Sequence, residues 1–110
     1  MSKYRWIYTT WPEAALAKQV AQTLVGEGLC ACANILPGMT SVYRWQGTIE
    51  TASEVVMILK VSEQASNRLR ARVLALHPAT TPCYLALDIN TDESSDDFLV
   101  WISNQSAEAP

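Results

Sequence analysis

The sequence predicts an α+β fold, with an antiparallel four-stranded sheet, two helices on one of its faces and a third helix near the C-terminus. Segments rich in β-branched and aromatic residues alternate with segments whose apolar residues recur at helical spacing. The breaks between them are short, and one has the two-residue length of a tight hairpin turn. The chain has 110 residues, of which 49% are hydrophobic and 17% charged. These values predict a single domain over residues 1–110 and exclude a disordered chain.

A strand and a helix open the chain. Tyr4–Thr9 is rich in aromatic and β-branched residues, which favour a strand. Thr10 and Glu13 then have the spacing of a capping box, in which the hydroxyl accepts a first-turn amide and the carboxylate reaches back. The buried stripe of the following helix is formed by Leu16, Val20 and Leu24. Gly26 ends this helix, because glycine is the common residue after a helix C-terminus.

An interrupted strand and a very long one come next. Leu29–Leu36 and Met39–Trp45 are two halves of one strand, separated at Pro37–Gly38 by a bend or bulge. Gln46–Gly47 is a short hairpin turn. Thr48–Val61 is then a strand of 14 residues. It would extend roughly 48 Å, whereas a compact domain of this size is about 34 Å across, so we expect a long protruding hairpin.

The protruding hairpin has two interpretations. Its unpaired strand edges would invite another chain, and its even-numbered face from Glu50 to Lys60 mixes charged and apolar groups as an interface would. The other interpretation is a solvated tip with ordinary surface charges. Glu50, Glu54 and Lys60 share this face, but their spacing is too wide for paired acid–base catalysis and is more typical of a salt-bridge set.

The second half of the chain completes the sheet. Ser62 caps a second helix, which ends before His77–Pro78. The apolar face of this helix carries Leu69, Val73 and Leu76. Tyr84–Ile89 is the fourth strand, and Ser94–Asp97 begins a last helix. The order β-α-β-β-α-β is that of the split βαβ, or ferredoxin-like, motif, in which one face of the sheet is left bare.

Composition and motifs exclude several function classes. The net charge of −3 argues against a nucleic-acid partner, and no apolar run is long enough for a membrane span. No phosphate-binding loop, dinucleotide fingerprint or nucleophile elbow occurs. An acylphosphatase-like hydrolase would need an arginine beside a glycine-rich cradle, and Thr9–Pro12 has neither. Trp45 and Trp101 are either anchors of a pocket or interface or parts of the core.

Three cysteines and one histidine are the candidate metal-binding residues. Cys30 and Cys32 are expected on one strand face, where they could hold a soft ion such as Cu(I) or Zn, or be small buried hydrophobes. His77, at a helix end, either has a functional partner or only caps the helix. The third cysteine, Cys83, leaves an odd number, which is typical of a reducing compartment and predicts a cytoplasmic location.

An ordered set of motifs resembles the CutA divalent-cation-tolerance family. The matching segments are Ala31–Gly38, Ser41–Gly47, Ile49–Glu50, Glu54–Lys60, His77–Pro78, Thr81–Pro82 and Phe98–Ile102. The resemblance runs from about Trp6 to Ser103. It implies a ferredoxin-like subunit of a tight homotrimer, with long hairpins exchanged between neighbours, in agreement with the length of Thr48–Val61.

The resemblance also implies a function. Proteins of this family are linked to copper and divalent-cation tolerance, so we expect a non-enzymatic protein with copper or another divalent metal as its candidate cofactor. The alternative is a PII-like signalling module that binds a small metabolite or nucleotide in clefts between subunits and contacts a partner protein. The expected cleft residues are Tyr43, Trp45, Glu54 and Lys60, with Lys60 available for an anionic group and Trp45 for a flat one.

The sequence departs from the family pattern where relatives are proposed to bind copper. Thr9 stands at the position of a cysteine, and only His77 remains of a pair of histidines. Ala79 and Cys83 replace a tyrosine and a glutamate. Because His77 and Cys83 flank one short loop, they could form a new pair of soft ligands. The candidate metal ligands are therefore His77, Cys83 and Cys32.

Overall fold

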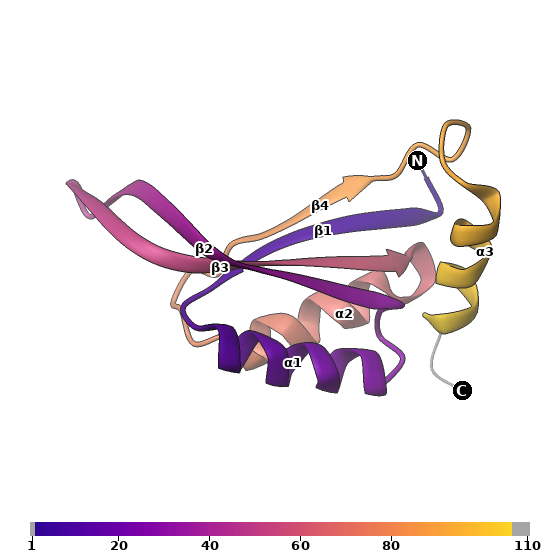
Figure 1. The fold of residues 1–110 in the computed structure, drawn as a ribbon, viewed down its shortest axis with the longest axis horizontal. Helices are drawn as coiled ribbons and strands as arrows, with labels where there is room; N and C mark the ends of the chain where they lie inside the picture. The colour runs from indigo at the N-terminus through magenta and orange to yellow at the C-terminus, as the bar shows by residue number, and fades with distance from the viewer. Residues whose placement is uncertain (1, 107–110) are drawn as a thin grey trace.

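The computed structural model describes residues 2–106, along which the elements follow the predicted order (Figure 1). Residues 1 and 107–110 of the predicted domain lie outside this range. The elements are β1 (Tyr4–Trp11), α1 (Ala14–Gly26), β2 (Cys32–Trp45), β3 (Thr48–Ser62), α2 (Glu63–Leu76), β4 (Tyr84–Asp88) and α3 (Asp96–Gln105). The predicted ferredoxin-like α+β fold is confirmed.

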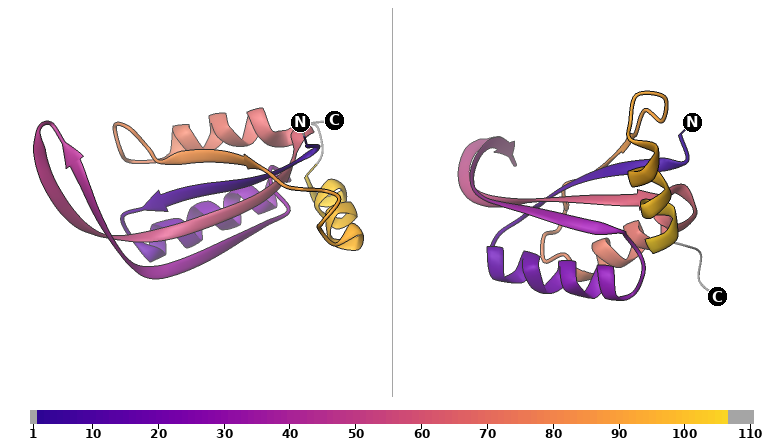
Figure 2. Two further views of the ribbon diagram at one scale, coloured as in Figure 1. Left: turned by 90° about the horizontal axis from the view of Figure 1, so that it is seen from above. Right: turned by 45° about the vertical axis from the view of Figure 1, so that its right-hand side comes forward.

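The strands form one antiparallel sheet in the order β2-β3-β1-β4. Helices α1 and α2 lie side by side under one face of this sheet, and α3 lies at the end where β1 begins (Figures 1 and 2). Within residues 2–106, the opposite face is covered by a helix only at that end, where α3 packs. We call this opposite face the open face. The bare sheet face that the element order predicts is thus present.

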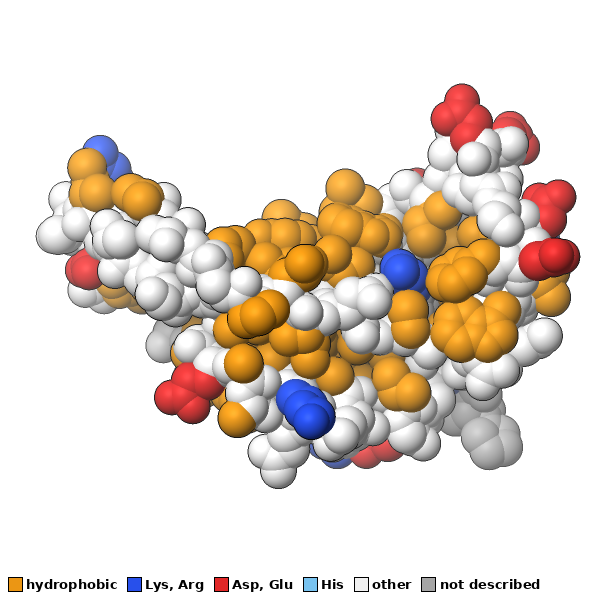
Figure 3. Space-filling model, viewed as in Figure 1, with side chains coloured by type: hydrophobic (Ala, Val, Ile, Leu, Met, Phe, Trp, Pro, Cys, Tyr) orange, Lys and Arg blue, Asp and Glu red, His pale blue; other side chains and the backbone are white. Residues whose placement is uncertain are grey.

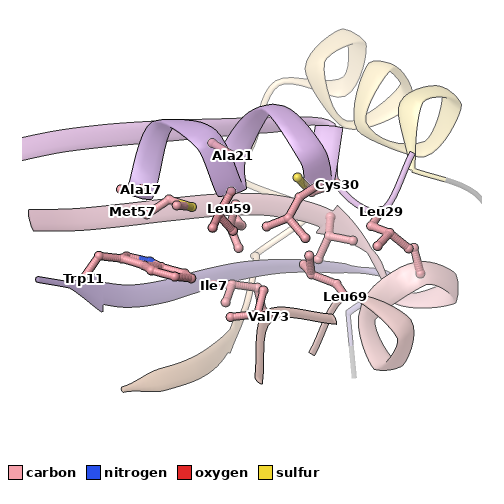
Figure 4. Close-up of a cluster of buried hydrophobic side chains, with 14 of the residues drawn as sticks. Ile7, Trp11, Ala17, Ala21, Leu29, Cys30, Met57, Leu59, Leu69 and Val73 are labelled. Carbon is pink, nitrogen blue, oxygen red and sulfur yellow. The ribbon is translucent and has the colours of Figure 1, made fainter. Parts of the chain in front are cut away.

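The core lies between the sheet and the two helices (Figure 4). Alternate residues of β1 and β3 point toward the helices because successive side chains of a strand point to opposite faces. The sheet contributes Ile7, Thr9, Trp11, Val55, Met57, Leu59 and Val61, all buried. The helices contribute Ala17, Val20, Ala21, Leu24, Ala65, Leu69 and Val73. Each large apolar side chain buried in this way contributes about 1.5–3 kcal/mol.

The structure corrects the boundary between the first strand and α1. Thr10 and Trp11 continue β1, with Trp11 paired to Val55, so Thr10 does not cap the helix. Glu13 occupies the cap position without a side-chain hydrogen bond. The predicted capping box is wrong because the Trp11 ring is fully buried, and the gain from burying a large aromatic side chain exceeds that from a cap of about 1 kcal/mol.

Two further boundaries and one helix cap differ from the prediction. β2 begins at Cys32, because the preceding residues close the end of α1, where the Leu29 amide donates to the Leu24 carbonyl. Cys30 therefore precedes the strand and does not share a strand face with Cys32. Ser62 is the residue before α2, but the predicted side-chain cap is wrong, because its hydroxyl donates to the Ser106 carbonyl and not to α2. The last helix follows Ser95, one residue after the predicted start.

The hairpin of β2 and β3 protrudes from the body and curls at its tip (Figures 1 and 2). β3 has 15 residues, and the molecule measures 43 × 29 × 22 Å. The predicted bulge is confirmed by a register shift between Leu36 and Met39, with Gly38 at φ +81°. Gln46 and Gly47 form the turn with φ of 50° and 82°.

None of the helices within residues 2–106 has the length and apolar character to cross a bilayer.

Candidate functional site

The bulge in β2 decides which side chains of the hairpin share the open face. Before it, Ala33 and Ile35 lie opposite Leu59 and Met57 and face the core. The extra residue reverses the alternation, so that Met39 lies opposite Glu54 on the open face. By the same pairing, Ser41, Tyr43 and Trp45 follow on that face. A strand without the bulge would point these three side chains to the other side.

A cleft of about 540 Å³ lies between the hairpin, the end of β1 and the connection from α2 to β4. We call it the hairpin cleft. Its walls come from the end of β1, the distal half of β2, one residue of β3 and the connection between α2 and β4. The lining residues are Tyr8, Thr10, Ser41, Val42, Tyr43, Trp45, Glu54, His77, Ala79, Thr80, Thr81 and Cys83.

A network of contacts, buried at Thr9 and Trp11 and partly exposed at His77, adjoins the hairpin cleft. The Thr9 hydroxyl donates to the Met57 carbonyl at 2.8 Å and accepts from the Trp11 indole at 2.7 Å. The Trp11 ring in turn contacts the His77 ring, with centroids 4.3 Å apart. His77 Nε2 lies 2.7 Å from the Thr10 carbonyl, and the Ala79 amide donates to His77 Nδ1 at 3.1 Å. These contacts join the end of β1 to the loop that follows α2.

Both ring nitrogens of His77 are therefore engaged. Nδ1 accepts the Ala79 amide, so this nitrogen carries no proton, and Nε2 is the donor to Thr10. A metal ion at either nitrogen would have to break one of these hydrogen bonds. Of the two interpretations open for His77, the geometry agrees with a structural role, which includes a link to β1 besides the helix end.

The three cysteines lie in three different surroundings. Cys83 lines the hairpin cleft near His77. Cys30 is buried in the core, where desolvation raises the pKa of its thiol to about 12. Cys32 lies opposite Lys60 at the far end of the β2–β3 pair, with its thiol 3.8 Å from the Asn34 side-chain oxygen. Within residues 2–106, no three His, Cys, Asp or Glu side chains gather as a metal site.

The four predicted cleft residues do not all lie in the same place. Tyr43, Trp45 and Glu54 line the hairpin cleft together with His77 and Cys83. Lys60 does not, because it is six residues from Glu54, about 20 Å along a strand. Its ammonium lies 5.3 Å from the centre of the Phe98 ring, in a cation–π contact at the α3 end of the sheet.

Exposure decides between the interpretations of the two tryptophans. Trp45 is 43% and Trp101 39% exposed, so neither belongs to the core. Trp45 lines the hairpin cleft, whereas Trp101 packs beside Phe98, with ring centroids 5.3 Å apart.

Sequence reasoning missed Tyr8 and Thr10 as cleft residues. The signal was their alternation with buried positions of β1, which places both on the open face.

A sequence model of the CutA1 divalent ion tolerance protein family matches residues 5–105 of this chain. The divalent-cation tolerance protein CutA of Thermus thermophilus is 41% identical over 96 residues, which are 87% of this chain and 91% of the relative. The protein of the same name from Pyrococcus horikoshii is 38% identical over 96 residues, with the same coverage of both chains. The match thus includes every helix and strand.

Solved structures agree with this similarity. The divalent cation tolerance protein of Thermus thermophilus superposes with a TM-score of 0.89 at 38% identity, covering 94% of this chain and 99% of that one. A protein from Nostoc described as PII-like protein CutA, in its apo form, superposes with a TM-score of 0.89 at 27% identity, covering 96% and 99%. The long hairpin and the open face are therefore parts of a shared fold.

Proposed function

Because this chain belongs to the CutA1 divalent ion tolerance protein family, we propose that it acts in divalent metal-ion tolerance as a cytoplasmic homotrimer that catalyses no reaction. Assembly would use the open face, and ligand binding would use the hairpin cleft. The three free cysteines suit a reducing cytoplasm.

Large hydrophobic side chains on the open face support assembly. Leu36 on β2 and Leu85 and Leu87 on β4 are 52, 57 and 47% exposed, on the two edge strands of the sheet. Figure 3 displays hydrophobic side chains along one side of the molecule, between the hairpin and α3. Monomeric proteins rarely leave continuous apolar patches of more than a few hundred Å² in water. Further copies of the chain would cover this surface.

Light scattering coupled to gel filtration tests the homotrimer. We expect a mass about three times the 12.1 kDa of one chain. Leu87→Glu should lower this mass, because a charge would be buried at the interface. Leu74→Glu is the matched control, since Leu74 is 44% exposed on α2, outside the open face. A single-chain mass for the unaltered protein would refute the assembly.

Copper does not fit the three predicted ligands within one chain. Both nitrogens of His77 are hydrogen-bonded, and Cys32 lies at the far end of the sheet from the cleft. Of the three predicted ligands, only Cys83 remains beside the cleft. A copper site would therefore need ligands from a neighbouring copy. We propose an organic molecule, and not copper, as the ligand of the hairpin cleft.

The lining of the hairpin cleft is the observation that carries this choice. Tyr8, Tyr43 and Trp45 supply three aromatic rings, and Glu54 supplies a carboxylate. Mostly apolar clefts with a few convergent polar groups are typical small-molecule sites. No lysine or arginine from residues 2–106 lines the cleft. We therefore expect a flat molecule that is neutral or cationic, whereas a nucleotide would need a cation, such as Lys60, from a neighbouring copy.

A PII-like signalling role is the second candidate, and the position of the cleft favours it. The hairpin cleft is lined by the distal half of β2, so that Tyr43 and Trp45 belong to the protruding hairpin itself. A ligand in the cleft would change the orientation in which the hairpin meets a partner protein. Metal tolerance would then depend on that partner, with no metal stored on this chain.

A comparison of melting temperatures tests the ligand class. The protein is heated alone and with Cu(II), Zn(II), adenosine or ATP, because a ligand of the native state raises the melting temperature by mass action. We expect a rise with adenosine, the flat neutral probe. A rise with ATP alone would support the signalling candidate with a cation from a neighbouring copy. A rise with the metal ions alone would refute the organic ligand.

Matched variants test whether the ligand that raises the melting temperature binds in the hairpin cleft. Trp45→Ala should remove the rise caused by the ligand, whereas Trp101→Ala, which removes a similarly exposed ring at the α3 end, should not. Calorimetric titration with Cu(I) and Cu(II), repeated with His77→Ala and Cys83→Ser, tests the metal separately. Copper binding that weakens in both variants would support the predicted metal site at this loop, and copper binding that is unchanged from the unaltered protein in both would refute it.

A further inference from the structure

A second groove lies on the opposite side of the molecule from the open face, between α2 and the edge strand β4. Its volume is about 420 Å³. We call it the α2–β4 groove. Its lining residues are Arg5, Glu63, Ser66, Asn67, Arg70, Tyr84 and Ala86. None of them lines the hairpin cleft, so the α2–β4 groove is independent of the proposed function.

One face of α2 supplies the polar wall of this groove. Glu63, Ser66, Asn67 and Arg70 follow the spacing i, i+3, i+4, i+7, which places them on one side of a helix. The core-facing residues Ala65, Leu69 and Val73 form the neighbouring stripe. The polar stripe thus borders the core and faces the sheet edge. The groove thus has a polar wall on α2 that faces Tyr84 and Ala86 of β4.

Tyr84 at the start of β4 contributes an unusual hydroxyl. Its ring packs against the core, and its oxygen is buried without a hydrogen-bond partner among residues 2–106. A buried polar group without a partner costs about 1–3 kcal/mol, so such groups are rare in native proteins and call for an explanation. Burial raises the pKa of the Tyr84 phenol, and this effect exceeds the opposing effect of nearby Arg70. Tyr84 therefore remains an O–H donor.

The two arginines of the groove differ in their charge balance. The Arg5 side chain is nine-tenths buried and has two carboxylates beside it, Glu63 at 3.4 Å and Asp88 at 3.2 Å. Its charge is therefore compensated within the chain. Arg70 has no carboxylate partner among residues 2–106, whereas Arg72, on the same helix, forms a two-pronged pair with Glu27. Arg70 is thus the available cation of the α2–β4 groove.

We propose that the α2–β4 groove binds a small carboxylate ligand, whose anionic group pairs with Arg70 and, after a side-chain movement that uncovers the buried Tyr84 hydroxyl, accepts the hydroxyl hydrogen of Tyr84. Asn67 and Ser66 lie beside this position and supply further hydrogen-bond donors. Glu63 at the other end of the groove repels a doubly charged anion. A singly charged carboxylate is therefore favoured over inorganic phosphate.

Titration of the full-length, isotope-labelled protein with sodium acetate, followed by NMR at constant ionic strength, tests the site. We expect saturable shifts of amide signals in α2 and β4, and weaker binding of inorganic phosphate. Arg70→Gln should weaken acetate binding about tenfold or more, the effect of one lost charge-assisted hydrogen bond. Arg72→Gln is the matched control and should leave binding unchanged, because it removes the same charge two residues away.

Tyr84→Phe separates binding from folding. Without ligand, this variant should melt at or above the temperature of the unaltered protein, because it removes a buried hydroxyl that lacks a partner. With acetate, the melting temperature of the unaltered protein should rise more than that of the variant. Equal acetate binding by Arg70→Gln and Arg72→Gln, an unchanged affinity of Tyr84→Phe, or tighter binding of phosphate than of acetate would each overturn the proposal.

Discussion

The two faces of β3 lie in different environments, since one packs against the helices and the other belongs to the open face. Val55, Met57 and Leu59 point toward the helices and are at most 6% exposed. Their neighbours Glu54 and Lys60 point to the open face, where one lines the hairpin cleft and the other contacts Phe98. The helix-covered face of β3 thus contributes to the core, whereas its open face carries charged side chains outside the core. A single strand can combine the two roles because its side chains alternate.

Trp11→Ala should have the largest effect, because Trp11 is fully buried on the helix-covered face. Loss of a buried tryptophan costs about 3–5 kcal/mol in the free energy of unfolding. Urea denaturation followed by circular dichroism measures the change. Trp45→Ala is the control from the open face and should cost far less. Equal losses for the two variants would contradict the division between the faces.

His77→Ala tests the network that joins the two faces. The variant removes the ring contact with Trp11 and leaves the Thr10 carbonyl and the Ala79 amide without their partners. We expect a loss of about 2 kcal/mol in the free energy of unfolding, the cost of unsatisfied backbone groups that are partly exposed. Hydrogen exchange of the amides in residues 77–83 should also accelerate. Unchanged stability together with lost metal binding would instead identify His77 as a ligand.

The reactivity of the thiols of Cys30 and Cys32 allows the buried and the open side of the sheet to be compared. Desolvation raises the pKa of Cys30 to about 12, so between pH 9 and 12 the folded protein keeps the neutral thiol while the unfolded chain has mostly lost the proton. The stabilising effect of this burial is complete below pH 9, the ordinary value, and declines as the pH rises toward 12. At pH 8 we expect a thiol reagent to label Cys32 and Cys83 while Cys30 stays unlabelled until the protein unfolds.

The pH dependence can be measured against a variant without the thiol. Between pH 9 and pH 11, the unfolding free energy of the unaltered protein should fall faster than that of Cys30→Ala, by about 1 kcal/mol per pH unit. Both proteins share the titration of all other groups, so the difference reports Cys30. Parallel pH profiles, or rapid labelling of Cys30 in the folded protein, would show that this thiol is accessible.

Gln46→Asn should have the smallest effect, because the hairpin tip is far from both faces of the core. Gln46 has φ +50°, a left-handed conformation that asparagine adopts more readily in two-residue turns. We expect a gain of about 0.5 kcal/mol or less in thermal unfolding. Gln46→Val is the matched comparison and should destabilise, since β-branched residues rarely adopt positive φ. A gain from valine would contradict the turn geometry.

Much of the fold follows from local patterns. The alternation in β1 and β3, the apolar stripes of α1 and α2 and the bulge at Pro37–Gly38 involve residues close together in the chain, so the sequence predicts them. The predicted capping box at Thr10 is wrong because a strand pairing with a residue distant in the sequence replaced the local helix cap. Trp11 pairs with Val55, 44 residues away, and no local pattern contains that contact.

The sequence by itself determined the order of elements, the length of the hairpin and the two faces of the sheet, because each depends on local periodicity. Only the tertiary structure decided which candidate residues meet. It placed His77 against Trp11 and brought Tyr43, Trp45 and Glu54 to one cleft, while Lys60 and Cys32 went to the other end of the sheet. The physical reason is that long-range register and burial, unlike periodicity, depend on every packed element at once.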